Sequence, residues 1–341
     1  MTDTRRADRA PVFVVGSARS GTTLLYHTLL SSGGYAVYRG EPALFDLVQP
    51  RYGDLRHRSS RTRLLGEWPR SHLARACGLD DVARCAEVLD SVRSNGDFLR
   101  AVMSRLAARQ GVARWAVWGP DNLLLMPWIK RELPDARFVH MVRDGRDVAL
   151  SIGTEGWIRP LPWDRGAESL VAALHWQWKV QRGRRDAARL GSDYLELHFE
   201  QLVQDRRGAL EILSTFLGHA IDADAVADAR IGTLRDPNST FAGEHSPPVG
   251  RWRERMPPPL VASIEGAIGS TLEAFGYARG TAERGRPLSL AFAIYPSWFS
   301  LKHVLRTHSA LGRLADRGRL RLDAPMAAEP LRQELEEARR A

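Results

Sequence analysis

A short apolar run, a glycine-framed loop and a helical pattern follow one another near the N-terminus and constrain the fold most strongly. The run PVFVVG occupies residues 11–16, the loop ends at Gly21, and TTLLYHTLLSS predicts a helix over 22–32. A buried strand, a glycine turn and a helix N-terminus direct backbone N–H groups and the helix dipole toward one point. The sequence therefore predicts an anion-binding corner in an α/β protein.

This loop has the frame of a nucleotide-triphosphate loop but lacks its lysine. Gly16 and Gly21 have the spacing of G-x-x-x-x-G, while Thr22 stands where such loops carry Lys. Arg19 lies inside the loop, and its planar guanidinium suits phosphate or sulfate oxygens. Thr22 and Thr23 are expected to cap the helix and to offer hydroxyls. The set fits an anion that bridges two groups better than a magnesium-bound triphosphate.

A second charged constellation follows a later apolar run. RFVHMV over 137–142 predicts a strand, and a helix beginning near Asp144 would place Ser151 about two turns along. Arg143 at the strand end and Ser151 on the helix can converge on one further anion. The alternative is a helix start rich in Asp and Arg that forms only a local ion pair.

Strand-like and helical patterns alternate along most of the chain. Helical patterns cover 82–94, 96–110 and 260–276, and further strands are expected in YAVY (35–38), RWAVWG (114–119) and YLELHF (194–199). Alternation of this kind favours a parallel sheet with helices on both faces. Ligands of such sheets bind at the carboxyl ends of the strands.

Charge and cysteine usage narrow the class of partner. The formal net charge is +9, which favours an anionic partner, and no nucleic-acid-binding module accompanies it. A small polyanion is the simpler expectation. Cys77 and Cys85 have neither CxxC spacing nor a neighbouring histidine cluster, so we expect two buried thiols in a cytoplasmic protein and no zinc site. No apolar run approaches the roughly 20 residues of a membrane span.

Together, GSARSGTT and VRDGRDVALS resemble the two cofactor-binding signatures of the PAPS-dependent sulfotransferases, where PAPS is 3′-phosphoadenosine 5′-phosphosulfate. The resemblance extends over about residues 11–256 and includes bacterial members. It implies a single α/β domain with a P-loop-like central parallel β-sheet flanked by helices over 11–280. A flexible tail (1–10) would precede this domain, and a mostly helical C-terminal extension (281–341) would follow it. PAPS would be the donor, PAP the product, and no metal would take part.

The same resemblance assigns roles to particular residues. The 5′-phosphosulfate would be held by Arg19, Ser20, Gly21, Thr22 and Thr23. The 3′-phosphate would be held by Arg143 and Ser151. VGRWRERM resembles the late loop that closes over that phosphate, which adds Gly250, Arg251 and Trp252. One departure is WGPDN (118–122), which lacks the Lys of the Lys-Thr-Pro-like segment in related bacterial enzymes.

Glu41 is the candidate general base. YRGEPALFD (38–46) resembles the Gly-Glu-Pro segment of bacterial sulfotransferases that act on carbohydrates and related acceptors, in which the Glu is the base. A carboxylate after the second expected strand would lie beside the phosphate loop and could take the proton of an acceptor hydroxyl. A helix cap or an ion pair with Arg19 is the alternative role. His140 and His175 are expected to be structural.

Two segments outside the signatures have open roles. Residues 51–75 are basic and expected to be irregular, as a surface loop or as a lid over an anionic acceptor. The apolar segment 287–305 is expected to pack in the core or against another subunit, as in a homo-oligomer. The other interpretation is contact with a membrane surface through Trp298, Phe299 and Lys302.

Two other functional classes compete with sulfuryl transfer to a small-molecule, carbohydrate or lipid-like hydroxyl. In a P-loop kinase-like phosphotransferase, Asp144 could hold a metal, but the absent Lys and the adjacent Arg143 disfavour this class. A non-catalytic nucleotide- or polyanion-binding protein would explain the basic loops. Such a protein has no need of an acid such as Glu41 in its anion pocket.

Overall fold

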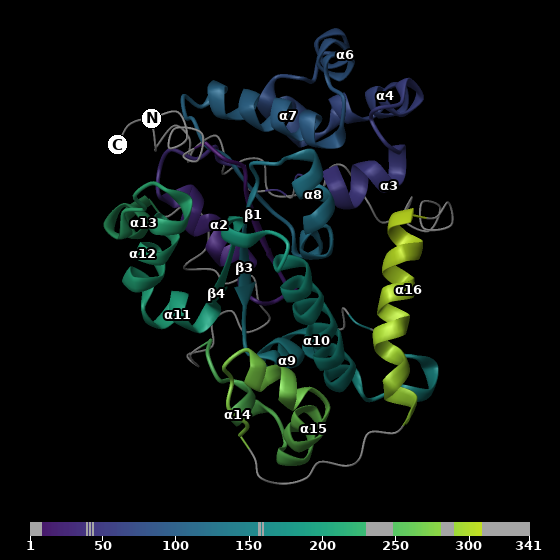
Figure 1. The fold of residues 1–341 in the computed structure, drawn as a ribbon, viewed down its shortest axis with the longest axis vertical. Coiled ribbons are helices and arrows are strands. Elements are labelled where there is room, and N and C mark those ends of the chain that lie inside the picture. The colour runs from purple at the N-terminus through teal and green to yellow at the C-terminus, as the bar shows by residue number, and fades with distance from the viewer. Residues whose placement is uncertain are drawn as a thin grey trace.

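The computed structural model describes residues 9–38, 40, 42, 44–155, 158, 160–229, 248–280 and 290–308. At its centre lies a parallel sheet of four strands in the order β2–β1–β3–β4 (Figure 1). The strands are β1 (Val12–Gly16), β2 (Ala116–Trp118), β3 (Arg137–Val142) and β4 (Tyr194–His198). The predicted α/β class and parallel sheet are confirmed.

The strand β1 is buried and apolar on both faces because helices cover both. Val12 and Val14 of β1 pack in one core with α2 (Thr22–Ser31), α12 (Arg206–Leu217) and α13 (Ala223–Ala229). Figure 1 shows these three helices together on one side of the sheet. Phe13 and Val15 alternate to the other side, in the core formed with α7 (Asn95–Arg109) and α8 (Met126–Glu132). Alternating side chains of a strand point to opposite faces, so one apolar run serves both cores.

The strand expected over 35–38 is wrong. Tyr35 forms one isolated parallel bridge with Arg114, and the N–H of Ala36 donates to the carbonyl of Arg114 at 2.8 Å. Beyond this point the side chain of Gln110 takes the place of a neighbouring strand. Its Oε1 accepts from the N–H of Val37 at 2.7 Å, and its Nε2 donates to the Val37 carbonyl at 3.0 Å.

The irregular structure expected over 51–75 is also wrong. This part of the chain is helical. A short π-helix (Leu44–Val48) leads into α3 (Gln49–Tyr52). It is followed by α4 (Arg58–Leu65), a 3₁₀ turn (Trp68–Arg70) and α5 (His72–Cys77). Leu55, Leu64 and Trp68 are buried, so a few widely spaced apolar residues anchor an arginine-rich surface. The helix α6 (Val82–Ser91) follows, as predicted.

The C-terminal half adds a second group of helices. These are α9 (Gly145–Glu155), α10 (Glu168–Ala187), α11 (Phe199–Gln204), α14 (Trp252–Arg255), α15 (Pro258–Ala274) and α16 (Tyr295–His308). Phe299 of α16 packs against His175 and Trp178 of α10, and Trp178 Nε1 donates to Ser300 Oγ at 3.0 Å. Residues 1–8 and 309–341 of the expected tail and extension lie outside the described residues.

Two further expectations concern the state of the cysteines and the absence of a membrane-spanning segment. Cys77 and Cys85 are buried and unbonded to each other, and burial raises their pKa to about 11 and about 12. The prediction of two buried thiols is confirmed. Within the described ranges, every helix is too short or too polar to cross a membrane.

Candidate functional site

The carboxyl ends of the four strands form one edge of the sheet. Trp118, Gly16, Val142 and His198 end their strands there, because the parallel register pairs β3 with β1 and with β4. The phosphate-like loop follows β1, Pro120 and Asp121 follow β2, Arg143 follows β3, and Phe199 follows β4. Residues far apart in the sequence therefore come together at the edge where parallel sheets bind ligands.

The loop after β1 holds a backbone conformation that few residues adopt. Among the described residues, Arg19 is the only one other than glycine with a positive φ, at 65°. Gly21 has φ 89°, and a Cβ there would lie 2.3 Å from Cδ2 of Phe199. Gly16 is equally constrained, because its Cβ would lie 2.6 Å from the carbonyl oxygen of Met141. Sparsely populated backbone conformations of this kind cluster at ligand-binding sites.

The expected capping role of the two threonines is wrong. Gly21 is the N-cap of α2 and makes no side-chain cap, while Thr22 and Thr23 are the first two residues inside the helix. The left-handed conformation of Gly21 starts the helix one residue earlier than a threonine cap would. The first N–H groups of a helix have no partner within it, so this end of α2 can receive an anion.

The two sequence signatures meet through arginine contacts. Arg19 Nε donates to Ser151 Oγ of α9 at 2.9 Å. Arg143 donates to the carbonyl of Arg19 at 3.0 Å and to the carbonyl of Pro248 at 2.5 Å. Through these two hydrogen bonds, Arg143 links the end of β3 to the loop after β1 and to the segment before Gly250. Its side chain is buried between them.

Several buried polar atoms at this edge have no hydrogen-bond partner. Within the part of the chain that the structure describes, they include Ser17 Oγ, Ser20 Oγ and Arg143 Nε. A buried donor left unpaired costs roughly 1–3 kcal/mol, so such groups usually face a ligand or water. Ser17, which the sequence analysis did not single out, belongs to the same loop and could have been found from that position.

Three arginines, Arg143, Arg19 and Arg251, bring positive charge together here. Burial lowers the pKa of Arg143, and the charges of Arg251 and Arg19 act in the same direction, while Asp147 and Glu200 oppose them. Three guanidinium groups that disfavour one another would be stabilised by a bound anion. The arrangement of buried donors, cations and a helix N-terminus fits a ligand with two anionic groups.

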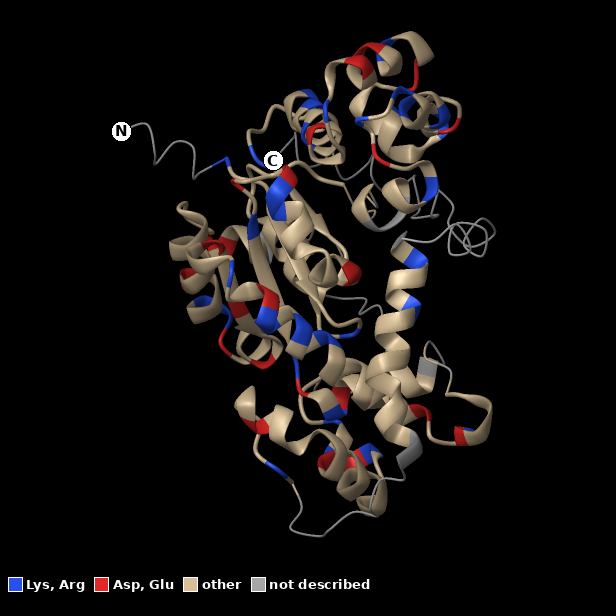
Figure 2. Cartoon of the chain, turned by 45° about the vertical axis from the view of Figure 1, so that its right-hand side comes forward, with Lys and Arg blue, Asp and Glu red and all other residues tan. Residues whose placement is uncertain are grey.

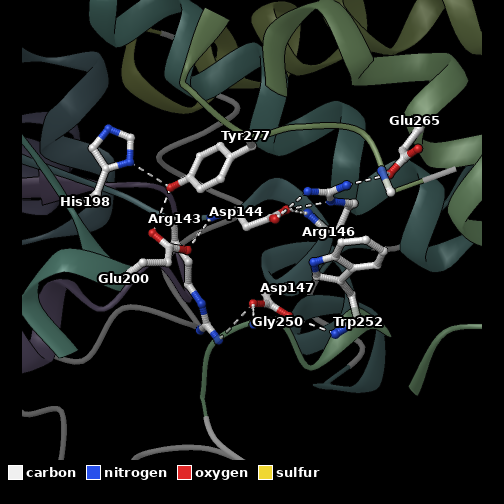
Figure 3. Close-up of polar contacts among 11 residues, drawn as sticks. Arg143, Asp144, Arg146, Asp147, His198, Glu200, Gly250, Trp252, Glu265 and Tyr277 are labelled. Carbon is white, nitrogen blue, oxygen red and sulfur yellow. Dashed lines mark hydrogen bonds and ion pairs between the residues drawn. The ribbon is translucent and has the colours of Figure 1, made fainter. Parts of the chain in front are cut away.

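Asp147 ties the late segment to α9. Its Oδ2 accepts from the N–H of Gly250 at 2.7 Å and its Oδ1 from the N–H of Trp252 at 3.0 Å (Figure 3). Nη2 of Arg143, four residues earlier in the chain, lies 3.9 Å from Oδ2 of Asp147. The indole of Trp252 is buried beneath the guanidinium of Arg146, 3.8 Å from the ring centroid. Gly250, Arg251 and Trp252 are thereby held beside Arg143, and the aspartate that holds them is not among the residues predicted from the sequence.

A polar network fixes the start of α9. Arg146 pairs with Asp144 at 2.7 Å and with Glu265 of α15 at 2.5 Å. Glu200 accepts from the N–H of Asp144 at 3.0 Å and from the hydroxyl of Tyr277 at 2.9 Å (Figure 3). The local Asp–Arg ion pair considered from the sequence is therefore present, and it lies beside the contacts of Arg143 without replacing them.

The carboxylates and histidines considered as proton acceptors differ in their surroundings. Glu41 lies outside the described residues. Asp121 accepts from Lys179 at 2.9 Å and from Arg306 of α16 at 2.6 Å, and these cations hold its pKa well below the usual carboxyl range. Desolvation lowers the pKa of His140 and of His175 to about 3, so both are neutral at pH 7. None of these three groups is poised as a proton acceptor by its pKa.

Fold and site together define an α/β protein in which buried hydrogen-bond donors and arginines gather at the carboxyl edge of a parallel sheet. The chain belongs to the sulfotransferase family, whose family model matches residues 11–223. It is therefore a sulfotransferase-family enzyme. Among the described residues, no cluster of three or more His, Cys, Asp or Glu side chains could hold a metal ion.

Solved structures give remote similarities. The sulfotransferase domain of the Synechococcus PCC 7002 olefin synthase is 17% identical, with 86% of this chain and 95% of that chain covered and a TM-score of 0.44. Sulfotransferase STF9 from Mycobacterium avium is 14% identical (80% and 79% covered, TM-score 0.45). Retinol dehydratase, crystallised with androsterone and the inactive cofactor PAP, is 16% identical (82% and 83% covered, TM-score 0.41). No curated protein sequence matches the chain significantly.

Proposed function

We propose that this enzyme transfers the sulfuryl group of PAPS to a hydroxyl of a small-molecule, carbohydrate or lipid-like acceptor. The observation that carries the proposal is the set of unpartnered buried atoms of Ser17, Ser20 and Arg143 beside the Arg19–Ser151 contact. These donors come from both signatures and face one edge of the sheet. A donor with a 5′-phosphosulfate and a 3′-phosphate supplies two anionic groups to match them.

The loop after β1 would hold the 5′-phosphosulfate. Backbone N–H groups from Gly21 to Thr23 and the positive end of α2 would bind its oxygens. The guanidinium of Arg19 would stabilise the negative charge that develops on the departing phosphate. These fixed donors serve the leaving group without a bridging metal.

The second anion site would hold the 3′-phosphate. Ser151 Oγ accepts from Arg19 Nε at 2.9 Å, which leaves its own hydroxyl proton available to a phosphate oxygen. The Nε of Arg143 is buried without a partner among the described residues and would donate to the same group. Gly250, Arg251 and Trp252 would close over it, positioned by the two hydrogen bonds to Asp147.

Glu41 would act as general base. As the acceptor oxygen forms its bond to sulfur, the bond from sulfur to the 5′-phosphate oxygen breaks, PAP leaves, and the acceptor proton passes to the carboxylate. The hydroxyl of Tyr26, on α2, donates to the carbonyl of Tyr38 at 2.5 Å. This contact ties the chain three residues before Glu41 to the helix that follows the phosphate loop, which supports a base near the transferring group.

Binding and transfer measurements test the proposal together. Calorimetry should show that 3′,5′-ADP binds and that ATP with Mg²⁺ does not compete. A transfer assay with labelled PAPS over a panel of sugars, lipid-linked sugars, phenols and alcohols should give a product of sulfate mass shift in the presence of EDTA. Preferential binding of ATP, or an absolute Mg²⁺ requirement, would support the phosphotransferase class instead.

A further inference from the structure

The C-terminal helix α16 carries an exposed apolar face. Most large apolar side chains that are exposed in the described residues lie on it or in the turn before it: Ile294, Trp298, Leu301, Val304 and Leu305, each 38–50% exposed. Residues 294, 298, 301 and 305 recur every three or four positions, which places them on one side of a helix. We call this set, with Val304 at its border, the α16 apolar face.

The opposite side of the same helix is already occupied. Tyr295 and Phe299 are buried, Phe299 packs against Trp178 of α10, and Arg306 pairs with Asp121 at 2.6 Å. Phe299 is therefore a packing residue and does not face outward, contrary to one interpretation of the sequence. In Figure 1, α16 runs along the outer side of α10. A helix that is apolar on its packed side and again on its exposed side presents a surface for a second partner.

The charge of α16 argues against a second copy of the same helix as the partner of this face. Residues 290–308 contain no Asp or Glu, so in Figure 2 the helix α16 carries blue but no red. Lys302 is exposed, four residues after Trp298 and three before Leu305. The acids that reach α16 from neighbouring elements are engaged: Asp121 pairs with Lys179 and Arg306, and Asp164 accepts from Tyr295 at 2.8 Å. Two copies of α16 would bring like charges together, whereas helix pairs are normally stabilised by opposite charges beside the seam.

A second exposed indole lies close to the start of α16. Trp163 is 65% exposed in the turn Pro162–Asp164, and this turn is fixed to α16 because Tyr295 bonds both Asp164 and the N–H of Leu161. Tryptophan has an apolar body and one polar N–H, and it concentrates at the boundary between lipid and water. An exposed indole therefore lies near the first turn of α16.

We propose that the α16 apolar face is a docking surface for an anionic lipid bilayer. At 14 residues the helix is about 21 Å long, so it would lie in the plane of the interface with Trp298 and Leu301 among the acyl chains. Lys302 would meet the negative headgroups. The proposal concerns α16 alone and does not depend on sulfuryl transfer.

Vesicle flotation of the full chain tests this surface directly. Wild type should float with vesicles of phosphatidylcholine plus phosphatidylserine, float weakly with phosphatidylcholine alone, and detach at high salt. The double variant Trp298→Ser, Leu301→Gln should lose about tenfold or more of the partition coefficient. Lys302→Glu should weaken binding to the anionic vesicles only. The matched control Val82→Ser, at a 57% exposed apolar residue of α6, should bind as wild type does.

Other outcomes overturn the proposal. If wild type floats with neither kind of vesicle, or if the double variant floats as well as wild type does, lipid docking by this face is ruled out. Light scattering would identify the competing partner: a wild-type dimer that the double variant converts to monomer would assign the face to a second copy. Melting temperature and 3′,5′-ADP affinity of each variant report whether the rest of the chain is intact.

Discussion

Arg19 Nε donates to Ser151 Oγ at 2.9 Å, although the two residues are 132 positions apart. This contact joins the strained loop after β1 to α9 and makes one site of two sequence signatures. Each residue therefore has two functions in the proposed enzyme, since it contacts a different part of the donor and also orients the other. Loss of either side chain should affect both anion sites.

Arg19→Ala should abolish measurable transfer and weaken binding of 3′,5′-ADP. A hydrogen bond to a charged group contributes roughly 1.5–3 kcal/mol, so the loss of affinity should be about 10- to 150-fold. Calorimetry on the folded variant measures the effect. Arg207→Ala is a suitable control, because Arg207 forms an exposed ion pair with Asp224 and should leave binding unchanged. Equal affinity in both variants would contradict the assignment of the loop.

Arg143 should determine the preference for a 3′-phosphate. Wild type should bind 3′,5′-ADP more tightly than 5′-AMP, and Arg143→Ala should remove most of this difference because the buried guanidinium is lost. The ratio of the two dissociation constants is the measured quantity. Arg143→Lys keeps the positive charge but lacks the planar guanidinium, so its ratio should lie between those of wild type and Arg143→Ala. If the alanine variant discriminates as wild type does, the second anion lies elsewhere and Arg251 is the next residue to test.

Asp147→Asn should loosen the segment from Gly250 to Trp252. The aspartate accepts two backbone hydrogen bonds there, and an amide can replace only one of its oxygens as acceptor. Affinity for 3′,5′-ADP should fall by about 5- to 150-fold, in line with one unpaired buried donor. Affinity for 5′-AMP should change much less, which a general loss of stability would not produce. Asp224→Asn, at an exposed aspartate, is the matched control.

The sequence predicts those parts of the fold whose signal is local. The runs 11–16 and 137–142 are long and apolar, and both are strands within a residue of the expected ends. The run 35–38 has the same local signal, but the side chain of Gln110, far away in the sequence, takes up its backbone hydrogen bonds. A pattern within four residues cannot report that competition.

The candidate site shows the same limit. The conformational demands on Gly16 and Gly21 and the charge of Arg19 follow from the loop motif. Asp147 does not, because its role depends on two backbone N–H groups about a hundred residues later in the chain. The helical structure of 51–75 is hidden in the sequence by its arginines, because the buried apolar residues that anchor it are scattered among them.

His140→Leu should make stability less sensitive to acid. His140 is buried on β3 beside the Tyr194 hydroxyl, and burial lowers its pKa to about 3 from an ordinary value near 6.5. The positive charges of Arg184, Lys179 and His198 act in the same direction. The melting temperature of wild type should fall between about pH 7 and about pH 5, and the fall should be smaller in the variant.

The sign of this effect follows from proton binding. The unfolded chain binds a proton at His140 below about pH 6.5, whereas the folded chain stays neutral there until about pH 3. Acid therefore favours unfolding across that window, and removal of the imidazole removes the effect. His57→Gln changes an exposed histidine and should keep the wild-type slope. Parallel slopes in all three proteins would show that His140 is not the group responsible.

Glu41→Gln should separate the base from the donor site. The amide keeps the size of the carboxylate but cannot take a proton, so turnover should fall by roughly 10²–10⁴ while 3′,5′-ADP affinity stays near wild type. The acidic limb of the pH–rate profile should disappear, because that limb reports protonation of the base. Turnover, affinity and melting temperature measured on this one variant decide the role.

The alternative roles of Glu41 give a different pattern. A helix cap would lower the melting temperature by the loss of about 1 kcal/mol, and an ion pair with Arg19 would weaken binding of 3′,5′-ADP, with turnover of the folded fraction largely kept. A stable, nucleotide-binding variant with near-normal turnover would assign the base to another residue. Asp121 and His140 would then be tested, although the cations around Asp121 and the burial of His140 both lower the pKa of the group and make it a weak proton acceptor. Such a result would therefore direct attention first to a base supplied by the acceptor itself.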